Sequence, residues 1–138
     1  MDPDVLRTAP PSHWETDTLE RRTIAWRRRL DGVAAVTVAE REEQIIGFAM
    51  GGDGRQKGQH DPVRDRELYS LYMLAVHHGT GAGQALLDAV LPPGMPAYLW
   101  VAEDNPRARR FYERNGFVPD GVRYLNEHLG IAEVRCIR

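Results

Sequence analysis

The glycine-rich segment Gly79–Gly83 has the composition that most directly suggests chemistry. It reads Gly-Thr-Gly-Ala-Gly, follows an apolar run and precedes a segment with helical periodicity. Glycines allow consecutive backbone N–H groups to turn toward one point, and the start of a helix adds about half a positive charge. The sequence therefore predicts a binding site for a ligand that carries phosphate.

Two widespread phosphate-binding loops do not fit this segment. A Walker A loop needs Gly-Lys-Ser/Thr, but Gly83 is followed by Gln84 and Ala85. A dinucleotide loop needs G-x-G-x-x-G/A, and the third position falls on Gln84 or Leu86, according to the glycine from which the count starts. What remains is G-x-G-x-G after a strand, without a lysine or a metal-binding hydroxyl.

The loop lies between a predicted strand and a predicted helix. The segment 67–74 combines aromatic and aliphatic residues and predicts a central strand. Beyond the loop, apolar residues at helical spacing predict a short helix that ends before Pro92. The residues expected to share one face of this helix are Ala82, Leu86, Ala89 and Val90.

A second strand and helix follow in the sequence. Ala97–Ala102 predicts a buried strand, and Asn105 with Pro106 has the composition of a helix N-cap followed by a first helical residue. Gly116 is the matching stop signal. Tyr112 lies seven residues after Asn105, which is two helical turns, so both side chains are expected on one side of the helix.

The N-terminal part has fewer signals. Residues 1–16 predict an irregular lead-in, with three prolines among the first 13 residues. Asp17 and Glu20 have the spacing of a capping box, and the apolar pattern after them predicts a helix over Asp17–Leu30 that Gly32 closes. The residues at helical spacing are Leu19, Thr23, Trp26 and Leu30.

The remaining segments predict two hairpins and a loop. Val33–Ala39 and Gln44–Met50 flank a charged turn, and Val118–Asn126 and Ile131–Ile137 flank a polar turn. The segment 51–65 is rich in Gly, Asp and Gln and predicts a mobile loop. The order of elements predicts a mixed α/β sheet covered by helices, in three layers at most.

The composition predicts one globular domain over residues 1–138. Of the 138 residues, 42% are hydrophobic and 28% charged, and no run approaches the about 18 apolar residues of a membrane span. The only cysteine, Cys136, cannot form a disulfide within the chain, so we expect a cytoplasmic protein. A net charge of −2 gives no electrostatic basis for binding nucleic acid or an anionic membrane.

Two stretches together resemble the GCN5-related N-acetyltransferase (GNAT) family. The segment from Leu71 to Leu87, LYMLAVHHGTGAGQALL, resembles the family's acetyl-CoA motif, with Gly81 and Gly83 at its two small-residue positions. The segment from 100 to 117, WVAEDNPRARRFYERNGF, resembles the family's second motif at the expected distance. The resemblance covers most of residues 17–138.

This resemblance implies a mainly antiparallel central sheet flanked by helices, and an enzyme that uses acetyl-CoA and no metal. The acetyl group would pass directly to a primary amine in a ternary complex, with no covalent enzyme intermediate. A small-molecule amine is the expected acceptor. The alternative is a non-catalytic sensor that binds CoA or acetyl-CoA.

The resemblance also implies which residues hold the cofactor. Backbone groups of the central strand would face the pantetheine arm, and the glycine loop would hold the pyrophosphate. His78 occupies the place where the family usually has Gln or Arg. The expected binding residues are Leu71, Tyr72, Met73, His78, Gly79, Thr80, Gly81, Ala82, Gly83, Gln84, Asn105 and Tyr112.

Two residues are predicted to move protons. By similarity to the family, Tyr112 would stand near the CoA sulfur and protonate the leaving thiolate; alternatively it belongs to the apolar stripe of its helix. Glu67 is the favoured base, because it shares a strand face with Tyr69; alternatively it is a solvated strand end. Glu103 and His77 are weaker candidates.

The chain departs from the family pattern at its N-terminus. Family members begin with a strand and a helix ahead of the residues that align with Asp17–Leu30, and this sequence predicts neither. The sheet would then start at Val33 and leave an edge and an apolar helix face uncovered. We therefore expect a homodimer, with contacts through the N-terminal helix or the first hairpin. The alternative is that residues 1–13 fold back over the edge and the protein is a monomer.

Overall fold

The computed structural model describes residues 6–8, 23–28 and 34–138, and the chain forms two compact units. The first unit spans Met1–Asp53 and Leu68–Pro92, and the second spans Gly54–Glu67 and Pro93–Arg138. Within the described residues, no helix has the length and apolar character needed to cross a membrane.

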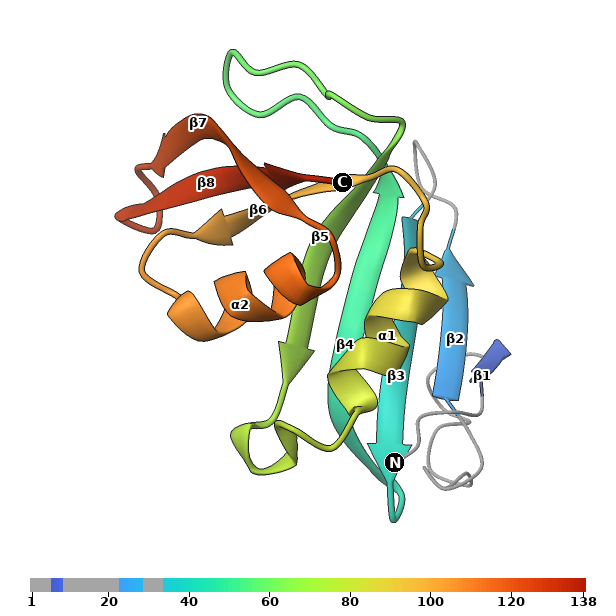
Figure 1. Cartoon of the computed structure of the whole chain (residues 1–138). Coiled ribbons are helices and arrows are strands. Elements are labelled where there is room, and N and C mark those ends of the chain that lie inside the picture. The colour runs from blue at the N-terminus through green and yellow to red at the C-terminus, as the bar shows by residue number, and fades with distance from the viewer. Residues whose placement is uncertain (1–5, 9–22, 29–33) are drawn as a thin grey trace. The chain divides into compact units, whose positions relative to one another are not determined.

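The first unit is built on a sheet with the strand order β1-β2-β3-β4-β5 (Figure 1). β1 pairs in parallel with β2, whereas β2 with β3 and β3 with β4 pair antiparallel, so the sheet is mixed. β5 begins in the second unit and continues into the first. The strands are β1 Leu6–Thr8, β2 Thr23–Arg28, β3 Ala34–Arg41, β4 Gln44–Asp53 and β5 Arg66–Met73.

The first predicted hairpin is confirmed as β3–β4. Its turn consists of Glu42 and Glu43, both with positive φ (52° and 66°), as a tight two-residue hairpin turn requires. The strands are longer than predicted, since β4 continues to Asp53. The first three residues of the predicted loop at 51–65 are therefore strand.

The helix predicted over Asp17–Leu30 is wrong where the structure describes it, because Thr23–Arg28 is strand β2. Two of its residues are β-branched and one is aromatic, which favours a strand, and every residue of β2 pairs with β3, as in Trp26 opposite Val36. This pairing outweighs an apolar spacing that also fits a helix. The capping box at Asp17 and Glu20 lies outside the described residues.

The sheet also begins earlier than predicted. Leu6–Thr8, inside the predicted irregular lead-in, forms β1 and pairs with Thr23–Ala25. The prediction of a sheet that starts at Val33 is therefore wrong. Residues 9–22, where a first helix would fall, lie outside the described residues.

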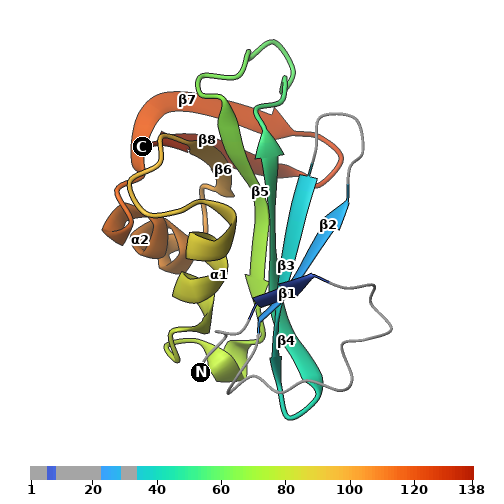
Figure 2. The same ribbon diagram turned by 90° about the vertical axis from the view of Figure 1, so that its right-hand side faces the viewer.

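Helix α1 (Ala82–Val90) covers one face of this sheet and packs against β3 and β4, as Figure 2 shows. Its buried residues are Ala82, Leu86, Leu87 and Val90. Leu87 takes the place that was predicted for Ala89, which is exposed. The sheet contributes buried apolar residues of its own, including Val38, Ile46 and Ala49.

The second unit contains a three-stranded antiparallel sheet in the order β6-β8-β7, together with helix α2. Its core consists of Tyr98, Leu99, Val101, Tyr112, Phe117, Val134 and Cys136, with Ala97 at the start of β6. The predicted strand, helix and final hairpin are all confirmed. Their bounds are β6 Tyr98–Ala102, α2 Pro106–Arg114, β7 Val118–Asn126 and β8 Ile131–Ile137.

Candidate functional site

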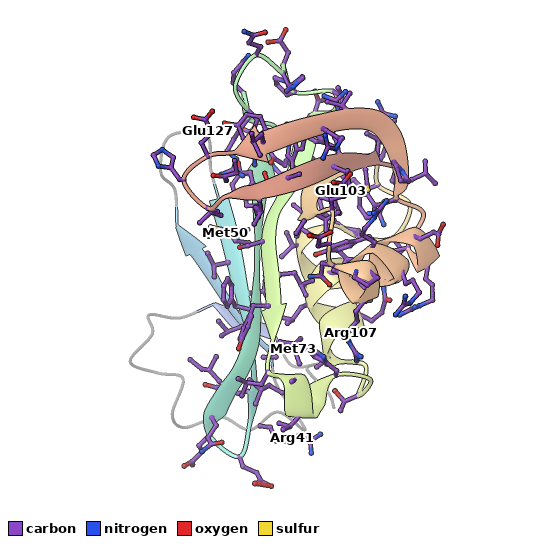
Figure 3. All side chains as sticks on the ribbon, turned by 90° about the vertical axis from the view of Figure 1, so that its left-hand side faces the viewer. Arg41, Met50, Met73, Glu103, Arg107 and Glu127 are labelled. Carbon is purple, nitrogen blue, oxygen red and sulfur yellow. The ribbon has the colours of Figure 1, made fainter. Side chains whose placement is uncertain are left out.

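The glycine loop begins where β5 ends in the first unit. Met73 is the last residue of β5 (Figure 3). It is buried, whereas Tyr72 is 53% exposed. A single 3-10 turn, Ala75–His77, connects the strand to the loop. The predicted pantetheine-facing residues and the predicted phosphate loop are therefore adjacent in one unit.

A close approach between β4 and β5 fixes this end of the strand. A Cβ atom on Gly47 would lie 2.5 Å from the carbonyl oxygen of Tyr72 and would clash with Sδ of Met73. The Leu74 N–H donates to the carbonyl of Ile46 over 2.8 Å. Only a glycine at position 47 leaves room for this contact, so β4 determines where β5 ends and where the loop starts.

The loop glycines have two different physical roles. Gly79 and Gly81 have φ values of 83° and 91°, which side chains disfavour, so both are needed for the backbone conformation. Gly83 has no such φ, and a Cβ atom there would meet only Cγ of Met73, at 3.7 Å. The fold therefore does not require a glycine at position 83, and its missing side chain leaves space beside the first turn of α1.

The first turn of α1 presents backbone N–H groups. These groups have no carbonyl four residues earlier within the helix, and together with the helix dipole they favour an anion. The Ala82 N–H lies 3.4 Å from Oγ1 of Thr80, and the Gln84 side chain donates to Asp88. Thr80, Gly81 and Gln84 are exposed, so a phosphate can approach from solvent.

His78 ties the loop back to the strand. Its backbone N–H donates to the carbonyl of Ala75 over 3.1 Å, and its ring Nε2 lies 3.1 Å from the carbonyl oxygen of Met73. A neutral imidazole that carries its proton on Nε2 donates to this carbonyl. His78 thus engages a backbone group that was predicted to face pantetheine. The side chain of His77 lies outside the described residues.

In the second unit, Asn105 caps helix α2 as predicted. Its Oδ1 accepts a hydrogen bond from the Ala108 N–H over 3.1 Å, and Pro106 is the first helical residue. The cap settles where α2 begins and therefore where Tyr112 lies along it. Contact of Asn105 with CoA stays a prediction.

Tyr112 is buried on α2 with 7% of its surface exposed. Its ring packs edge-on against Phe111 and Phe117, with centroid distances of 5.3 Å and 6.1 Å. Burial, and secondarily the neighbouring Cys136, raises the pKa of Tyr112 to about 12. The hydroxyl is therefore protonated near neutral pH, and the raised pKa makes it a weaker acid than an ordinary tyrosine.

Glu67 is one of the most buried charged residues, with 2% of its surface exposed. Its Oε1 accepts from the Arg55 backbone N–H over 2.9 Å and from the Tyr98 hydroxyl over 3.1 Å, and Oε2 accepts from Nη2 of Arg55 over 3.1 Å. The interpretation as a solvated strand end is therefore wrong. Burial, and then the Glu67 charge, raises the pKa of Tyr98, which holds its proton in this network.

Arg55 and Tyr98 were not predicted as partners of Glu67. Arg55 lies in a glycine-rich segment without periodicity, and Tyr98 looked like an ordinary residue of a buried strand. The Arg55 guanidinium contacts Glu67 from 12 positions away in the sequence, and the Tyr98 hydroxyl does so from 31 positions away. No local pattern marks such a contact.

Glu103, the weaker candidate, follows β6 (Figure 3) and is paired with an arginine. Its two carboxylate oxygens accept from Nη2 and Nε of Arg123 over 2.8 Å and 2.9 Å. This bidentate hydrogen bonding lowers the pKa of Glu103. Glu103 is therefore ionised and engaged at neutral pH.

The predicted site residues thus divide between the units. The first unit brings together the end of β5, His78 and the glycine loop. The second unit holds Glu67, Asn105 and Tyr112, with Glu67 bound to Arg55 and Tyr98 and Tyr112 packed on Phe111 and Phe117. No cluster of three or more metal-ligating side chains occurs among the residues that the structure describes.

A glycine loop between a strand and a helix, on a mixed sheet, is an arrangement that suits a phosphate-bearing ligand, and comparison with known proteins gives the class. The acetyltransferase (GNAT) family matches residues 4–117 of the chain. The chain therefore belongs to the GNAT family, and the predicted family and fold class are confirmed.

Sequence relatives include uncharacterized N-acetyltransferases of Mycobacterium tuberculosis H37Rv and Mycobacterium bovis. Each is 38% identical over 96 residues, a match that covers 64% of this chain and 56% of the relative. The chain thus spans little more than half the length of the curated relatives it matches.

Solved structures with this fold include a protein from Pyrococcus horikoshii, 26% identical with a TM-score of 0.58 over 75% of this chain and 63% of that one. Another is Arabidopsis thaliana Naa50 in complex with the bisubstrate analogue CoA-Ac-MVNAL. It is 22% identical, with a TM-score of 0.57 over 75% of this chain and 71% of that one. At this identity the likeness shows a shared fold.

The raised pKa of Tyr112 predicts a pH dependence of stability. The folded state favours the neutral phenol, so as the pH rises from 10.0, the ordinary pKa, to about 12, the unfolded state ionises first and the free energy of unfolding falls. The contribution is about 1.4 kcal/mol for each unit of pKa difference. Urea denaturation across this pH range should show a shallower fall for Tyr112→Phe. If the free energy of unfolding falls equally steeply with pH in Tyr112→Phe and in the unaltered chain, Tyr112 does not bury a neutral hydroxyl.

Proposed function

We propose that this chain binds acetyl-CoA and transfers its acetyl group to a primary amine by direct attack in a ternary complex. Family membership supports acetyl transfer in general terms. The observation that carries the proposal is the first turn of α1, where Gly83 leaves space that the fold itself does not need. A phosphate group next to exposed amides accounts for that space.

Two segments of the first unit would bind the cofactor. The pyrophosphate would lie against the loop from Gly79 to Gln84, and the pantetheine arm along Leu71–Met73. Because His78 engages the Met73 carbonyl, the arm would either use the remaining backbone groups or displace the imidazole. The CoA-based analogue bound to Arabidopsis Naa50, which has this fold, supports CoA as the ligand.

The reaction needs two proton transfers. The amine nitrogen attacks the thioester carbonyl, the C–N bond forms, the C–S bond breaks, and the amine loses a proton while the thiolate gains one. Tyr112 is proposed as the donor to sulfur because it matches the family residue that stands near the CoA sulfur, and its hydroxyl is protonated at neutral pH. Glu67 is proposed as the base, with Arg55 and Tyr98 holding its carboxylate in one orientation.

The acceptor, assembly and location are also proposals. We propose a small-molecule amine as acceptor and a cytoplasmic location, which suits the free, buried Cys136. A homodimer stays a proposal without the features that suggested it, because β2 pairs with β3, β5 lies beside β4, and Thr23–Arg28 is strand and provides no helical face. The alternative function is a sensor that binds CoA or acetyl-CoA without turnover.

The loop predicts selective stabilisation by cofactor. Acetyl-CoA at about 100 times its Kd should add about 2.7 kcal/mol to the free energy of unfolding, while NAD and ATP add none. Gly83→Ala should keep or raise the melting temperature of the free protein, since alanine favours a helix, and should weaken acetyl-CoA binding at least about tenfold. Thermal shift and calorimetry measure both quantities.

Ala89→Gly is the matched control for this change, because position 89 is exposed near the other end of α1. It should lower stability slightly and leave the Kd for acetyl-CoA unchanged. If Gly83→Ala binds acetyl-CoA as the unaltered chain does, the phosphates do not lie at this turn.

The proton donor predicts a change in kcat rather than in binding. Tyr112→Phe keeps the ring against Phe111 and Phe117 and removes only the hydroxyl, so kcat should fall by about a hundredfold with the Kd for acetyl-CoA nearly constant. Steady-state kinetics beside calorimetry separate the two effects. Unchanged kcat would leave Tyr112 as a packing residue and assign the proton to water.

A further inference from the structure

One face of the sheet in the second unit carries a cluster of aromatic and charged side chains. The β6–β8 register pairs Trp100 with Arg135, and the β7–β8 register pairs Tyr124 with Glu133. Glu133 and Arg135 are two residues apart on β8 and so share a face of the sheet. Trp100 and Tyr124 lie beside each other there, with ring centroids 6.1 Å apart.

A tight turn from the segment Gly54–Asp65 lies over this cluster. The backbones of Lys57 and His60 exchange two hydrogen bonds of 2.9 Å and 2.8 Å. A Cβ atom on Gly58 would lie 2.7 Å from Cε1 of Tyr124, so the turn rests directly on that ring. The His60 ring packs against Trp100 at 5.7 Å.

The turn inserts the only lysine of the chain between the rings. Nζ of Lys57 lies 5.3 Å from the centroid of Trp100 and 5.3 Å from that of Tyr124, and 2.6 Å from Oε1 of Glu133. Two electron-rich ring faces and a carboxylate are a combination that binds an ammonium group. We name Trp100, Tyr124 and Glu133 the ammonium cage.

The Lys57 ammonium does not make every interaction that the ammonium cage offers. Within the part of the chain that the structure describes, Oε1 of Glu133 is buried and accepts no well-directed hydrogen bond. The Lys57 contact at Glu133 is therefore ionic and off the preferred hydrogen-bond direction. A short tether to the turn restricts where this ammonium can lie, whereas a free ammonium has no such restriction.

The segment is anchored at its base rather than at its tip. The Gly54 N–H donates to Asp65, and the Arg55 N–H donates to Glu67 and Tyr98. The Lys57–His60 turn, by contrast, lies against side chains of the sheet, such as the Tyr124 ring beneath Gly58. Of the Lys57 side chain, 25% is exposed. Lys57 can therefore leave the cage while the base of the segment stays in place.

We propose that the ammonium cage is a binding site for a primary alkylammonium ligand, which Lys57 fills from within the chain until such a ligand replaces it. The ligand class is a terminal –CH₂–NH₃⁺ group on an aliphatic stem, such as one end of a diamine. The tethered Lys57 competes at an effective concentration on the order of millimolar. Binding of the ammonium at this site does not depend on acetyl transfer. A primary ammonium is also the protonated form of the proposed acceptor amine.

The test removes the Lys57 side chain from the ammonium cage and offers a free ammonium of similar shape in its place. Lys57→Ala should bind n-butylammonium, the free analogue of the whole lysine side chain, at least about tenfold more tightly than the unaltered chain does, measured by calorimetry. n-Butanol should not bind in the same range. Glu133→Gln in the Lys57→Ala background should remove the gain. Arg110→Ala, which removes an exposed cation on α2 outside the cage, should bind n-butylammonium like the unaltered chain.

A second measurement uses the unaltered chain, so it does not depend on whether a variant folds. In the unaltered chain, millimolar n-butylammonium should speed hydrogen exchange of the amides of residues 57–60, and n-butanol at the same concentration should not. Equal Kd values for n-butylammonium in Lys57→Ala and the unaltered chain, or equal binding of the alcohol, would overturn the proposal. So would exchange that n-butylammonium leaves unchanged.

Discussion

The end of β5 is the constraint on which the first unit depends. Gly47 lets β4 approach the Tyr72 carbonyl so closely that a single methyl group would not fit, and this contact sets the point where the strand stops. The chain then turns through Gly79 and Gly81, whose positive φ values direct it into α1. The strand end, the loop conformation and the helix start are therefore coupled. The result is a set of backbone N–H groups beside the open space at Gly83, and we propose that a phosphate binds to them.

The second unit depends on two buried polar side chains that lie in different surroundings. Tyr112 is held neutral by an apolar surrounding on one side of α2. Glu67, equally inaccessible, accepts hydrogen bonds from the Arg55 backbone, the Arg55 guanidinium and the Tyr98 hydroxyl. Burial of a carboxylate is tolerated because those donors replace water. Tyr112 and Glu67 are the two groups that we propose for the proton transfers of acyl transfer to an amine.

Local signals predicted most of this fold. The two hairpins, the glycine loop, the Asn105 cap and the helix after it follow from turn residues and periodicity, which act over a few positions. The segment around Trp26 was mispredicted because its apolar spacing fits both a helix and a strand, and pairing with β3 decides between them. The burial of Glu67 and the cage around Lys57 were beyond prediction for a related reason. Their partners lie tens of positions away, and no local pattern records them.

The central claim is that this chain moves an acetyl group from acetyl-CoA to a primary amine. The most direct test follows thiol release from acetyl-CoA across a panel of primary amines, with the mass of each amine measured after reaction. The account predicts thiol release that depends on at least one amine, together with an equal amount of that amine carrying an acetyl group. Acetyl-CoA that stabilises the protein but releases no thiol with any amine of the panel would contradict it. That outcome would favour a CoA-binding sensor.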